Sequence, residues 1–183
     1  MLLTDSDIMD EVLAKNMIQP FVEDMVEEGI SYGLGSFGYD LRLGSDFYIF
    51  DGDQGDVVDP KSFNENIGDK IESNAPVLLS PNSFMLGHAV EKLTMPDNVV
   101  GICVGKSTYA RSGLVVNITP VEPGWKGYLT IEMSNTTNSP IKVYPQEGIA
   151  QILFFKGDYP RKSYEDREGK YQNQEKTFYF SKI

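Results

Sequence analysis

Short apolar runs separated by turn-forming residues recur along the whole chain, and this pattern limits the possible folds more than any other feature. Turn pairs such as Pro81-Asn82, Pro96-Asp97 and Pro123-Gly124 punctuate the runs. Many short strands at this spacing favour an antiparallel sandwich or barrel over a sheet built from βαβ units. We therefore predict a mainly β protein, with strands at residues 40–43, 47–50, 77–79, 84–90, 99–104, 114–119, 128–134, 141–144 and 149–155.

One helix is expected, close to the N-terminus. Thr4 and Asp7 have the spacing of a capping box in which Asp replaces Glu, and an apolar stripe follows them. This pattern predicts a helix over residues 5–15. A length of 183 residues is typical of one domain with its own core, so we expect a single domain over residues 1–183.

Charge and composition argue against several classes of protein. The formal net charge of −11 argues against nucleic acid polymers as partners, because these are bound through a basic face. The longest apolar runs have the length of strands, so we expect no span across a membrane. The first residues lack the basic and apolar regions of a signal peptide, and one cysteine allows no internal disulfide. We therefore expect a cytoplasmic protein.

The scarcity of two residue types limits metal chemistry. Cys103 is the only cysteine and His88 the only histidine, so neither a structural zinc site nor a catalytic His/Cys/Cys zinc site can be assembled from this chain. Both residues lie in apolar runs. We expect Cys103 to be a core thiol and His88 to be structural.

A carboxylate in the middle of one predicted strand is the first candidate for chemistry. In the run from Tyr128 to Ser134, alternation places Thr130 and Glu132 on one face and Ile131 on the other. Burying a carboxylate costs several kcal/mol unless it is partnered. Glu132 is therefore either an outward-facing strand residue or a functional carboxylate, and periodicity alone leaves both interpretations open.

The segment Gly105-Lys-Ser-Thr-Tyr-Ala-Arg111 offers hydroxyl groups and positive charge suited to a phosphate or a sugar. Its Gly-Lys-Ser sequence is not the end of a P-loop, because that loop needs four residues between its glycines and only three separate Gly101 from Gly105. Residues 109–113 predict one or two helical turns that end at Gly113, too few for a P-loop helix. A P-loop NTPase is excluded.

The segment from Lys156 to Gln174 is charged and poor in apolar residues, and its aromatic residues are tyrosines. Composition alone favours a solvated, partly mobile terminus. The alternative is a lid whose tyrosines and lysines close over a ligand.

Several motifs, taken together and in their order along the chain, resemble those of dCTP deaminases, a family that shares its fold with the trimeric dUTPases. The strongest are Gly105-Lys-Ser-Thr-Tyr-Ala-Arg111, Val116-Asn-Ile-Thr-Pro120, Glu122-Pro-Gly-Trp125, Thr130-Ile-Glu132 and Ser134-Asn-Thr-Thr137. The resemblance extends to Gly38-Tyr-Asp-Leu-Arg42, Val58-Asp-Pro-Lys61, Gly148-Ile-Ala-Gln151 and Lys170-Tyr-Gln-Asn-Gln174. It covers most of the chain and is much more specific than any single motif.

The resemblance implies a distorted antiparallel β-sandwich or jelly-roll of the dUTPase-like β-clip type, with a short N-terminal helix. It implies a homotrimer whose active sites lie between neighbouring subunits. The implied reaction is deamination of dCTP to dUTP and ammonia in pyrimidine deoxynucleotide biosynthesis, with dTTP as an inhibitor in relatives. Other cytosine deaminases use zinc, which this composition cannot ligate, whereas this family needs none for the chemical step. Mg²⁺ is expected with the triphosphate, whose oxygens would supply most of its ligands.

The resemblance also implies roles for individual residues. Glu132 matches the proton shuttle, and Ser107 and Arg111 match residues that organise the base, the water and the phosphates. Burial would move the pKa of Glu132 toward neutrality, whereas a nearby Arg111 would oppose that shift. The implied substrate-binding residues are Lys106, Ser107, Thr108, Tyr109, Ala110, Arg111, Thr130, Ile131, Glu132, Gln151, Tyr164, Lys170 and Gln174. The last three would make residues 157–183 a lid.

Two other functions stay open. Bifunctional relatives also convert dUTP to dUMP and pyrophosphate. They have an Ala-Gly-x-Ile-Asp pattern before the glutamate-bearing strand, whereas this chain has Thr119-Pro-Val-Glu-Pro-Gly-Trp125. Glu122 is one methylene longer than Asp, so its carboxylate is displaced by about an ångström, which disturbs in-line attack on phosphorus. We therefore favour the single-activity deaminase. A catalytically idle nucleotide sensor is the other alternative, and the presence of Glu132 argues against it.

Overall fold

The computed structural model describes residues 1–50 and 57–182. Its helices are α1 (Asp5–Lys15) and the one-turn α2 (Ser107–Ala110). Its strands are β1 (Ile18–Gln19), β2 (Gly33–Leu34), β3 (Tyr39–Arg42), β4 (Asp46–Phe50), β5 (Gly68–Glu72), β6 (Val77–Leu79), β7 (Phe84–Thr94), β8 (Val99–Gly105), β9 (Leu114–Asn117), β10 (Lys126–Asn135), β11 (Ile141–Val143) and β12 (Gly148–Lys156).

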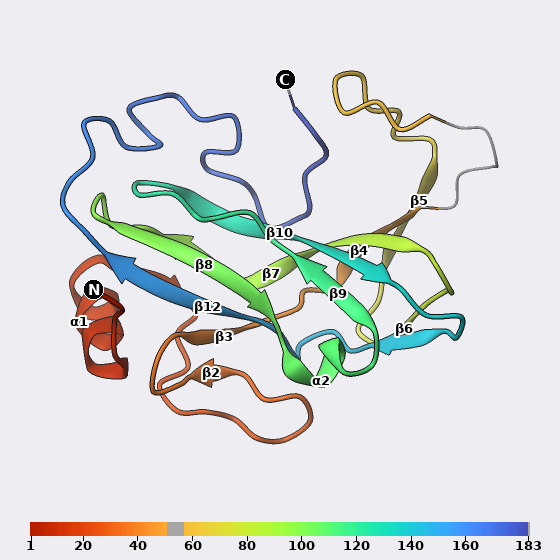
Figure 1. Cartoon of the computed structure of the whole chain (residues 1–183), viewed down its shortest axis with the longest axis horizontal. Helices are drawn as coiled ribbons and strands as arrows, with labels where there is room; N and C mark the ends of the chain where they lie inside the picture. The colour runs from red at the N-terminus through yellow and green to blue at the C-terminus, as the bar shows by residue number, and fades with distance from the viewer. Residues whose placement is uncertain (51–56, 183) are drawn as a thin grey trace.

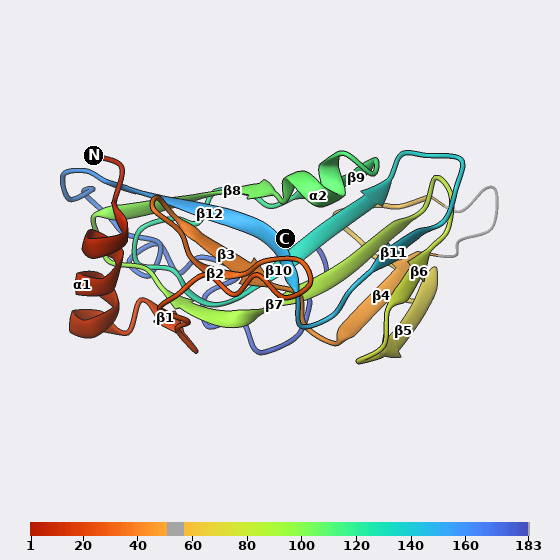
Figure 2. The ribbon, with the colours of Figure 1, turned by 90° about the horizontal axis from the view of Figure 1, so that it is seen from below.

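Two antiparallel sheets form the body of the protein (Figure 1). One has the order β5-β4-β7-β10-β9, with β1 paired to the last part of β7, and the other has the order β2-β3-β12-β8. Strands β6 and β11 make a separate two-stranded ribbon. Figure 2 shows the layers edge-on, with β8 and β12 in one layer and β7 in the other. The predicted mainly β sandwich with a short N-terminal helix is confirmed.

The core lies between the two sheets and explains the alternation along the strands. On β10, Ile131 and Met133 are fully buried, whereas Thr130 and Glu132 lie half-buried on the opposite face. The other sheet contributes side chains such as Phe154 to the same core. Each aliphatic side chain buried in this way stabilises the fold by about 1.5–3 kcal/mol. The core therefore fixes which face of β10 Glu132 occupies.

The N-terminal helix has the predicted boundaries and the predicted cap. The Thr4 hydroxyl accepts a hydrogen bond from the Asp7 amide, and the Asp7 carboxylate accepts one from the Thr4 amide at 2.9 Å. Lys156 at the end of β12 donates to Glu11 at 2.7 Å, which joins the helix to the sheet. None of the helices in the described part of the chain is long and apolar enough to cross a membrane.

Each predicted strand is present, with bounds that differ by a few residues. The pattern missed β1, β2 and β5. The first two contain two residues each, too few to show a period. Strand β5 pairs with β4 at the edge of its sheet, and none of its residues is fully buried, so it lacks the apolar alternation that marks a strand.

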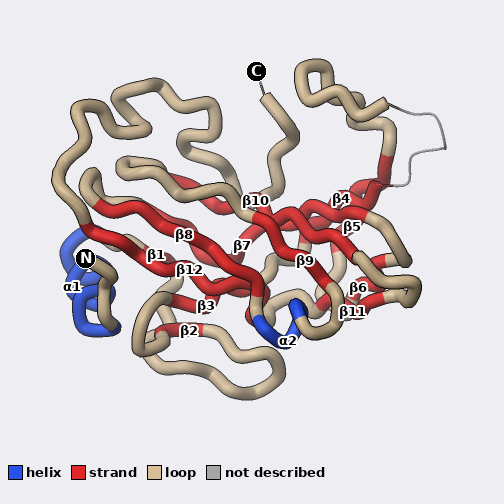
Figure 3. Tube along the Cα trace, in the orientation of Figure 1, coloured by secondary structure: helices blue, strands red, loops and turns tan. Residues whose placement is uncertain are grey.

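Over residues 157–182 the C-terminal segment contains no helix or strand, as Figure 3 shows, yet it is bonded to the sandwich. The Tyr128 amide donates to the Gln174 carbonyl at 3.1 Å, and the Trp125 indole donates to the Tyr171 carbonyl at 2.9 Å. Gly127 permits this approach, because a Cβ there would lie 2.7 Å from the Gln174 nitrogen. The segment is therefore packed along β10, in contrast to the solvated terminus that composition favours. Ile183, the last residue of the expected lid, lies outside the described residues.

Candidate active site

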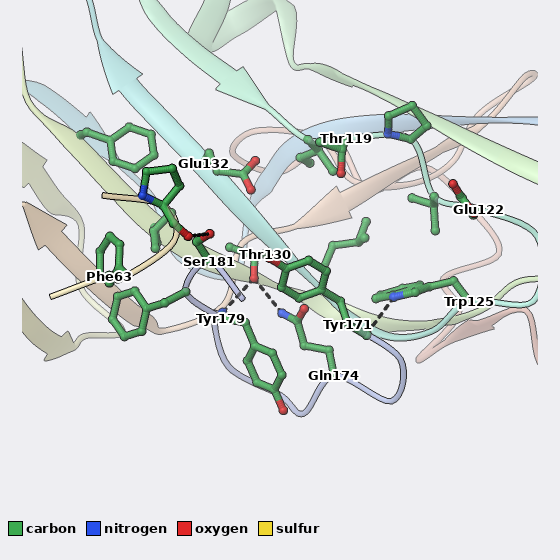
Figure 4. A pocket seen from close by; sticks show the side chains of 18 of the residues that line it. Phe63, Thr119, Glu122, Trp125, Thr130, Glu132, Tyr171, Gln174, Tyr179 and Ser181 are labelled. Atoms are coloured by element: carbon green, nitrogen blue, oxygen red, sulfur yellow. Dashed lines mark hydrogen bonds between the residues drawn. The ribbon is translucent and has the colours of Figure 1, made fainter. Parts of the chain in front are cut away.

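A cavity of about 620 Å³ lies between β10, the loop that precedes it and the C-terminal segment (Figure 4). Thr130 and Glu132 line it from β10, and Tyr164 and Gln174 line it from the C-terminal segment. Aromatic side chains close one end of the cavity, namely Phe50, Phe63, Phe84 and Phe180. This size and mixed lining suit a small molecule with an apolar ring and a few polar groups.

Glu132 is the most perturbed group in the cavity. One of its carboxylate oxygens, Oε2, is buried and has no hydrogen-bond partner among the described residues. Burial raises the pKa of Glu132 to about 7, and a hydrogen bond from its own amide offsets only part of this rise. In the described part of the chain no basic side chain pairs with Glu132. Within one chain, burial therefore prevails over Arg111 in setting the pKa of this carboxylate.

The single cysteine and the single histidine lie outside the lining of the cavity. Burial, and after it the charge of Glu132, raises the pKa of Cys103 to about 12, so this thiol stays protonated at neutral pH. His88 is buried on β7, with Nδ1 2.8 Å from the Ala89 carbonyl and Nε2 3.4 Å from Asp46. Both arrangements agree with the structural roles expected for these residues.

Thr130 joins the C-terminal segment to β10 beside Glu132. Its hydroxyl accepts a hydrogen bond from Gln174 Nε2 at 2.7 Å and another from the Tyr179 amide at 2.9 Å. Figure 4 shows both bonds below the Glu132 carboxylate. Gln174 is only 5% exposed, so its amide is held within the wall of the cavity.

An ion pair ties the hairpin before β10 to the same segment. The guanidinium of Arg167 pairs with the carboxylate of Glu122, which is also a lining residue of the cavity. Glu122 is the residue that would replace the aspartate of a bifunctional enzyme. Its carboxylate is occupied by a basic partner instead of facing the cavity alone.

The segment from Lys106 to Arg111 contains a second group of predicted site residues, and within one chain none of them lines the cavity. It connects β8 to β9 through α2, and Tyr109 anchors it by accepting a hydrogen bond from the Tyr144 amide at 2.9 Å. Ser107 and Arg111 are exposed, and their side chains make no hydrogen bond or ion pair with any of the described residues. They are thus free to contact a ligand or another subunit.

The predicted site residues therefore divide into two groups. The cavity is lined by Thr130, Glu132, Tyr164 and Gln174. The residues outside its lining are Lys106, Ser107, Thr108, Tyr109, Ala110, Arg111, Ile131, Gln151 and Lys170. Ile131 points into the core, so only its backbone could meet a ligand, and Lys170 is exposed, with Nζ 3.4 Å from the Lys182 carbonyl.

Sequence reasoning missed several residues of the cavity. Trp125 and Tyr171 lie next to each other in its lining, joined by the hydrogen bond from the indole to the Tyr171 carbonyl, and Tyr179 and Phe180 also line the cavity. Trp125 and Tyr171 stand within the motifs that resemble the family, but nothing in the sequence pairs them. Phe178, Tyr179 and Phe180 form an aromatic run that could have indicated packing against the core. The run lies beyond residues 156–174, the segment whose composition was considered.

The residues present offer little to a protein-bound metal. Among residues 1–50 and 57–182, no three His, Cys, Asp or Glu side chains gather closely enough to hold an ion. A metal bound mainly by the oxygens of a nucleotide would need no such group.

Comparison with known proteins identifies the family. The family model described as dCTP deaminase-like matches residues 2–157. The dCTP deaminase of Acidobacterium capsulatum is 52% identical over 174 residues, covering 94% of each chain. The dCTP deaminase of Campylobacter concisus is 51% identical over 177 residues, covering 95% of this chain and 94% of the relative.

A solved structure supports the fold alone. The 2'-deoxycytidine 5'-triphosphate deaminase of Agrobacterium tumefaciens matches with a TM-score of 0.65 and 21% identity. The match covers 85% of this chain but 48% of that chain, so this protein spans about half the length of that relative. By the family match and the relatives that share half of its sequence over nearly their whole length, the chain belongs to the dCTP deaminase family.

Proposed function

We propose that this protein hydrolyses dCTP to dUTP and ammonia, as the names of its relatives indicate for those proteins. The observation that carries the proposal is Glu132, a half-buried carboxylate that lines the cavity and has a pKa of about 7. A group with a pKa near the working pH can accept and return protons with similar ease. Cytosine deamination needs such a group, because protons must move onto the ring and onto the departing amine.

The reaction balances with one water and one carboxylate. The water oxygen attacks C4 of cytosine while Glu132 takes a proton from this water. Glu132 then delivers that proton to N3. The tetrahedral carbon then carries a hydroxyl and an amino group. Glu132 takes the hydroxyl proton and passes it to the amine, the C4–N bond breaks, and ammonia leaves. The carbonyl of uracil remains and Glu132 returns to its starting state.

The cavity walls suggest how the nucleotide is held. The aromatic end offers apolar contact, while Thr130 and Gln174 offer polar groups to the base or sugar. Tyr164, Lys170 and Gln174 lie in the segment over residues 157–183, which we propose acts as a lid that excludes water from C4. Lys170 is exposed at the surface of this segment, where it can reach a phosphate.

We propose that a neighbouring subunit supplies Ser107 and Arg111, because the cavity of one chain lacks both. The outward faces of β8 and β9 expose apolar side chains that one chain leaves uncovered. Ile102, Val104 and Val115 are 36%, 47% and 50% exposed. Such a patch next to α2 favours contact with a second copy. The homotrimer implied by the family resemblance would cover this patch and complete each site.

Mixed subunits test the reaction and the shared site together. Glu132→Gln and Arg111→Ala homo-oligomers should each release no ammonia from dCTP. Co-expressed in equal amounts, they should recover activity in roughly a quarter of the sites of a cyclic oligomer, where an intact Glu132 meets an intact Arg111 from the neighbour. Light scattering should show a trimer or a multiple of it. Mixed oligomers without activity would mean that each site uses Glu132 and Arg111 of the same chain.

Three further features complete the proposal. Mg²⁺ accompanies the triphosphate and is bound mainly by its oxygens. The inhibitor dTTP competes for the same cavity, which an ammonia-release assay at increasing dTTP would measure. The protein works in the cytoplasm, in agreement with its single cysteine.

The contacts of Glu122 bear on the bifunctional alternative. Its pairing with Arg167 occupies the carboxylate that would have to activate a second water. Hydrolysis of dUTP needs a carboxylate free to accept a proton from water in line with phosphorus. We therefore propose the single-activity deaminase. A nucleotide sensor without catalysis leaves the perturbed pKa of Glu132 without a role.

A further inference from the structure

The lysine of the Lys106–Arg111 segment is bound inside the protein, unlike the arginine at the other end of the segment. Lys106 Nζ donates to Asp40 Oδ2 at 2.5 Å and to Ser31 Oγ at 2.9 Å. The side chains of Lys106 and Asp40 are 13% and 4% exposed. Two partners already hold the ammonium that the sequence motif suggests for a phosphate.

Asp40 depends on this lysine for its only ion pair among the described residues. It lies on β3, opposite Gly33 of β2 and Gln151 of β12, in the middle of the four-stranded sheet. Its other oxygen, Oδ1, has no hydrogen-bond partner in the described part of the chain. A buried carboxylate with one unpartnered oxygen becomes strongly destabilising when its cation is removed.

Lys106 also occupies the position that fixes where α2 begins. It is the N-cap residue, its amide donates to the Ile149 carbonyl at 3.1 Å, and its carbonyl accepts from the Ala110 amide at 3.0 Å. Its side chain does not cap the helix, because an ammonium group cannot accept a hydrogen bond from a helix amide, and it extends to β3. A turn of four residues is not stable by itself. The Lys106 pair and the buried Tyr109 are thus the side-chain anchors that hold α2 while Ser107 and Arg111 stay exposed.

We propose that Lys106 is a positioning residue, which holds α2 against β3 through Asp40 and Ser31 and does not bind the phosphates of the nucleotide. The inference rests on the proposed function, in which Ser107 and Arg111 contact the substrate. If Lys106 moved to a phosphate, Asp40 would lose its cation in the interior. With the pair intact, Lys106 and Asp40 hold α2 in place and so set the positions of Ser107 and Arg111.

Three variants test this role, namely Asp40→Asn, Lys106→Gln and the double variant with both changes. Misplacing catalytic groups by about an ångström costs on the order of 10²-fold in rate. Each single variant should lose roughly 10–100-fold in kcat/KM for dCTP, mainly in kcat, and the double variant should be no worse than the poorer single one. The double variant buries no unpaired charge, so it carries the test if a single variant does not fold.

The control is the Lys156–Glu11 pair, which also joins a lysine to a carboxylate, at 2.7 Å between β12 and the N-terminal helix. Glu11→Gln combined with Lys156→Gln should keep kcat/KM within about twofold of wild type, because this pair joins α1 to the end of β12 and neither residue lines the cavity. A similar loss in this control would mean that removing any lysine–carboxylate pair impairs the enzyme, and would overturn the positioning role.

Hydrogen exchange without nucleotide gives a readout that does not depend on the reaction. The amides of residues 107–111 should exchange faster in the Asp40 and Lys106 variants than in wild type or the control. Unchanged exchange, or full activity of Asp40→Asn beside an impaired Lys106→Gln, would overturn the inference and make Lys106 a phosphate ligand. If wild type released no ammonia, the proposed function would fail, while the exchange result would still decide what Lys106 holds.

Discussion

Thr130 Oγ1 accepts a hydrogen bond from Gln174 Nε2 at 2.7 Å, and this bond fastens the C-terminal segment to the strand that carries Glu132. Thr130 and Glu132 are two residues apart on one face of β10, so both reach the same cavity. Any movement of the segment that breaks this bond changes the polar groups beside the carboxylate. The cover of the cavity and its chemistry are therefore coupled through one strand.

Glu132→Gln should abolish ammonia release while dCTP binding stays within roughly tenfold of wild type. The amide keeps the size and polarity of the side chain but cannot transfer protons. Ammonia release and equilibrium binding of dCTP measure the two effects separately. Glu65→Gln is the matched control, because Glu65 is an exposed residue paired with Lys70. Deamination above a few per cent of wild type in Glu132→Gln would remove Glu132 from its assigned role.

The same variant should change how stability depends on pH. Burial raises the pKa of Glu132 from 4.5 to about 7, so between these values the folded protein holds a proton that the unfolded chain has released. Stability contributed by this proton is present at low pH and is lost as pH rises through that window. Glu132→Gln should therefore gain stability relative to wild type on going from pH 4 to pH 8, by up to about 3 kcal/mol. Thermal unfolding of both proteins at one concentration measures the gain, and equal pH dependence would contradict the raised pKa.

Truncation after Lys162 should abolish most dCTP turnover and also lower the unfolding temperature. The removed part contains Tyr164 and Gln174, which line the cavity. It also contains Phe178, which is 8% exposed and packs with Tyr48 and Leu86. From composition alone, removing this part would not be expected to change the stability of the core. Turnover of dCTP by the shortened protein at the wild-type rate would show that the segment is not a lid.

Thr130→Val separates the attachment of the segment from its presence. Valine has the shape of threonine but removes the acceptor of the Tyr179 amide and one of the two acceptors of Gln174 Nε2, which keeps its bond to the Thr177 carbonyl. Leaving a buried donor unsatisfied costs about 1–3 kcal/mol, so the segment should open more often. Limited proteolysis should then cut within residues 157–182 faster than in wild type. An unchanged rate of cleavage would mean that other contacts hold the segment closed.

The predictable part of the site is the part that one strand determines. A period of two residues is enough to place Thr130 and Glu132 on one face and Ile131 in the core, and the structure confirms it. The capping box of α1 is likewise a local pattern, complete within residues 4–7.

Contacts between distant residues could not be predicted in this way. Lys106 is separated from its partner Asp40 by 66 residues, and no local pattern states which carboxylate a lysine will meet. A phosphate and a buried aspartate can each bind an ammonium group. The motif around Lys106 contains other groups suited to a phosphate and gives no sign of Asp40, so the sequence favoured the phosphate. The path of the C-terminal segment depends on Phe178 and on Gly127, which lie far apart in sequence and act only once β10 is formed.

Chelation should distinguish the two metals that could assist cytosine chemistry. Activity should fall when Mg²⁺ is chelated and return when Mg²⁺ is added, because the triphosphate needs neutralisation of its charge. A chelator selective for zinc should have no effect, since one cysteine and one histidine cannot form the usual zinc sites. Elemental analysis of the purified active enzyme provides the independent check. Stoichiometric zinc would contradict the assigned mechanism.

The product of exhaustive dCTP conversion should be dUTP, with little dUMP or pyrophosphate. Deamination directs a water at C4 of the base, whereas hydrolysis needs a second water in line with a phosphorus atom, and one carboxylate cannot serve both positions. Glu122 is the only acidic residue in the hairpin before β10, and its carboxylate pairs with Arg167. Pro120 and Pro123 restrict the backbone on either side of it. Glu122→Gln should therefore weaken the attachment of the C-terminal segment without changing which nucleotide is formed.

Chromatography of the nucleotides and a pyrophosphate assay decide between the two activities. Arg167→Gln is the matched variant, because it breaks the same ion pair and leaves the Glu122 carboxylate free. If the pair has a purely structural role, both variants should turn over dCTP alike and yield only dUTP. Stoichiometric pyrophosphate from wild type that is lost in Glu122→Gln would show that Glu122 activates a second water. Retention of pyrophosphate in Arg167→Gln would then show that the carboxylate acts without its partner, and the enzyme would be bifunctional.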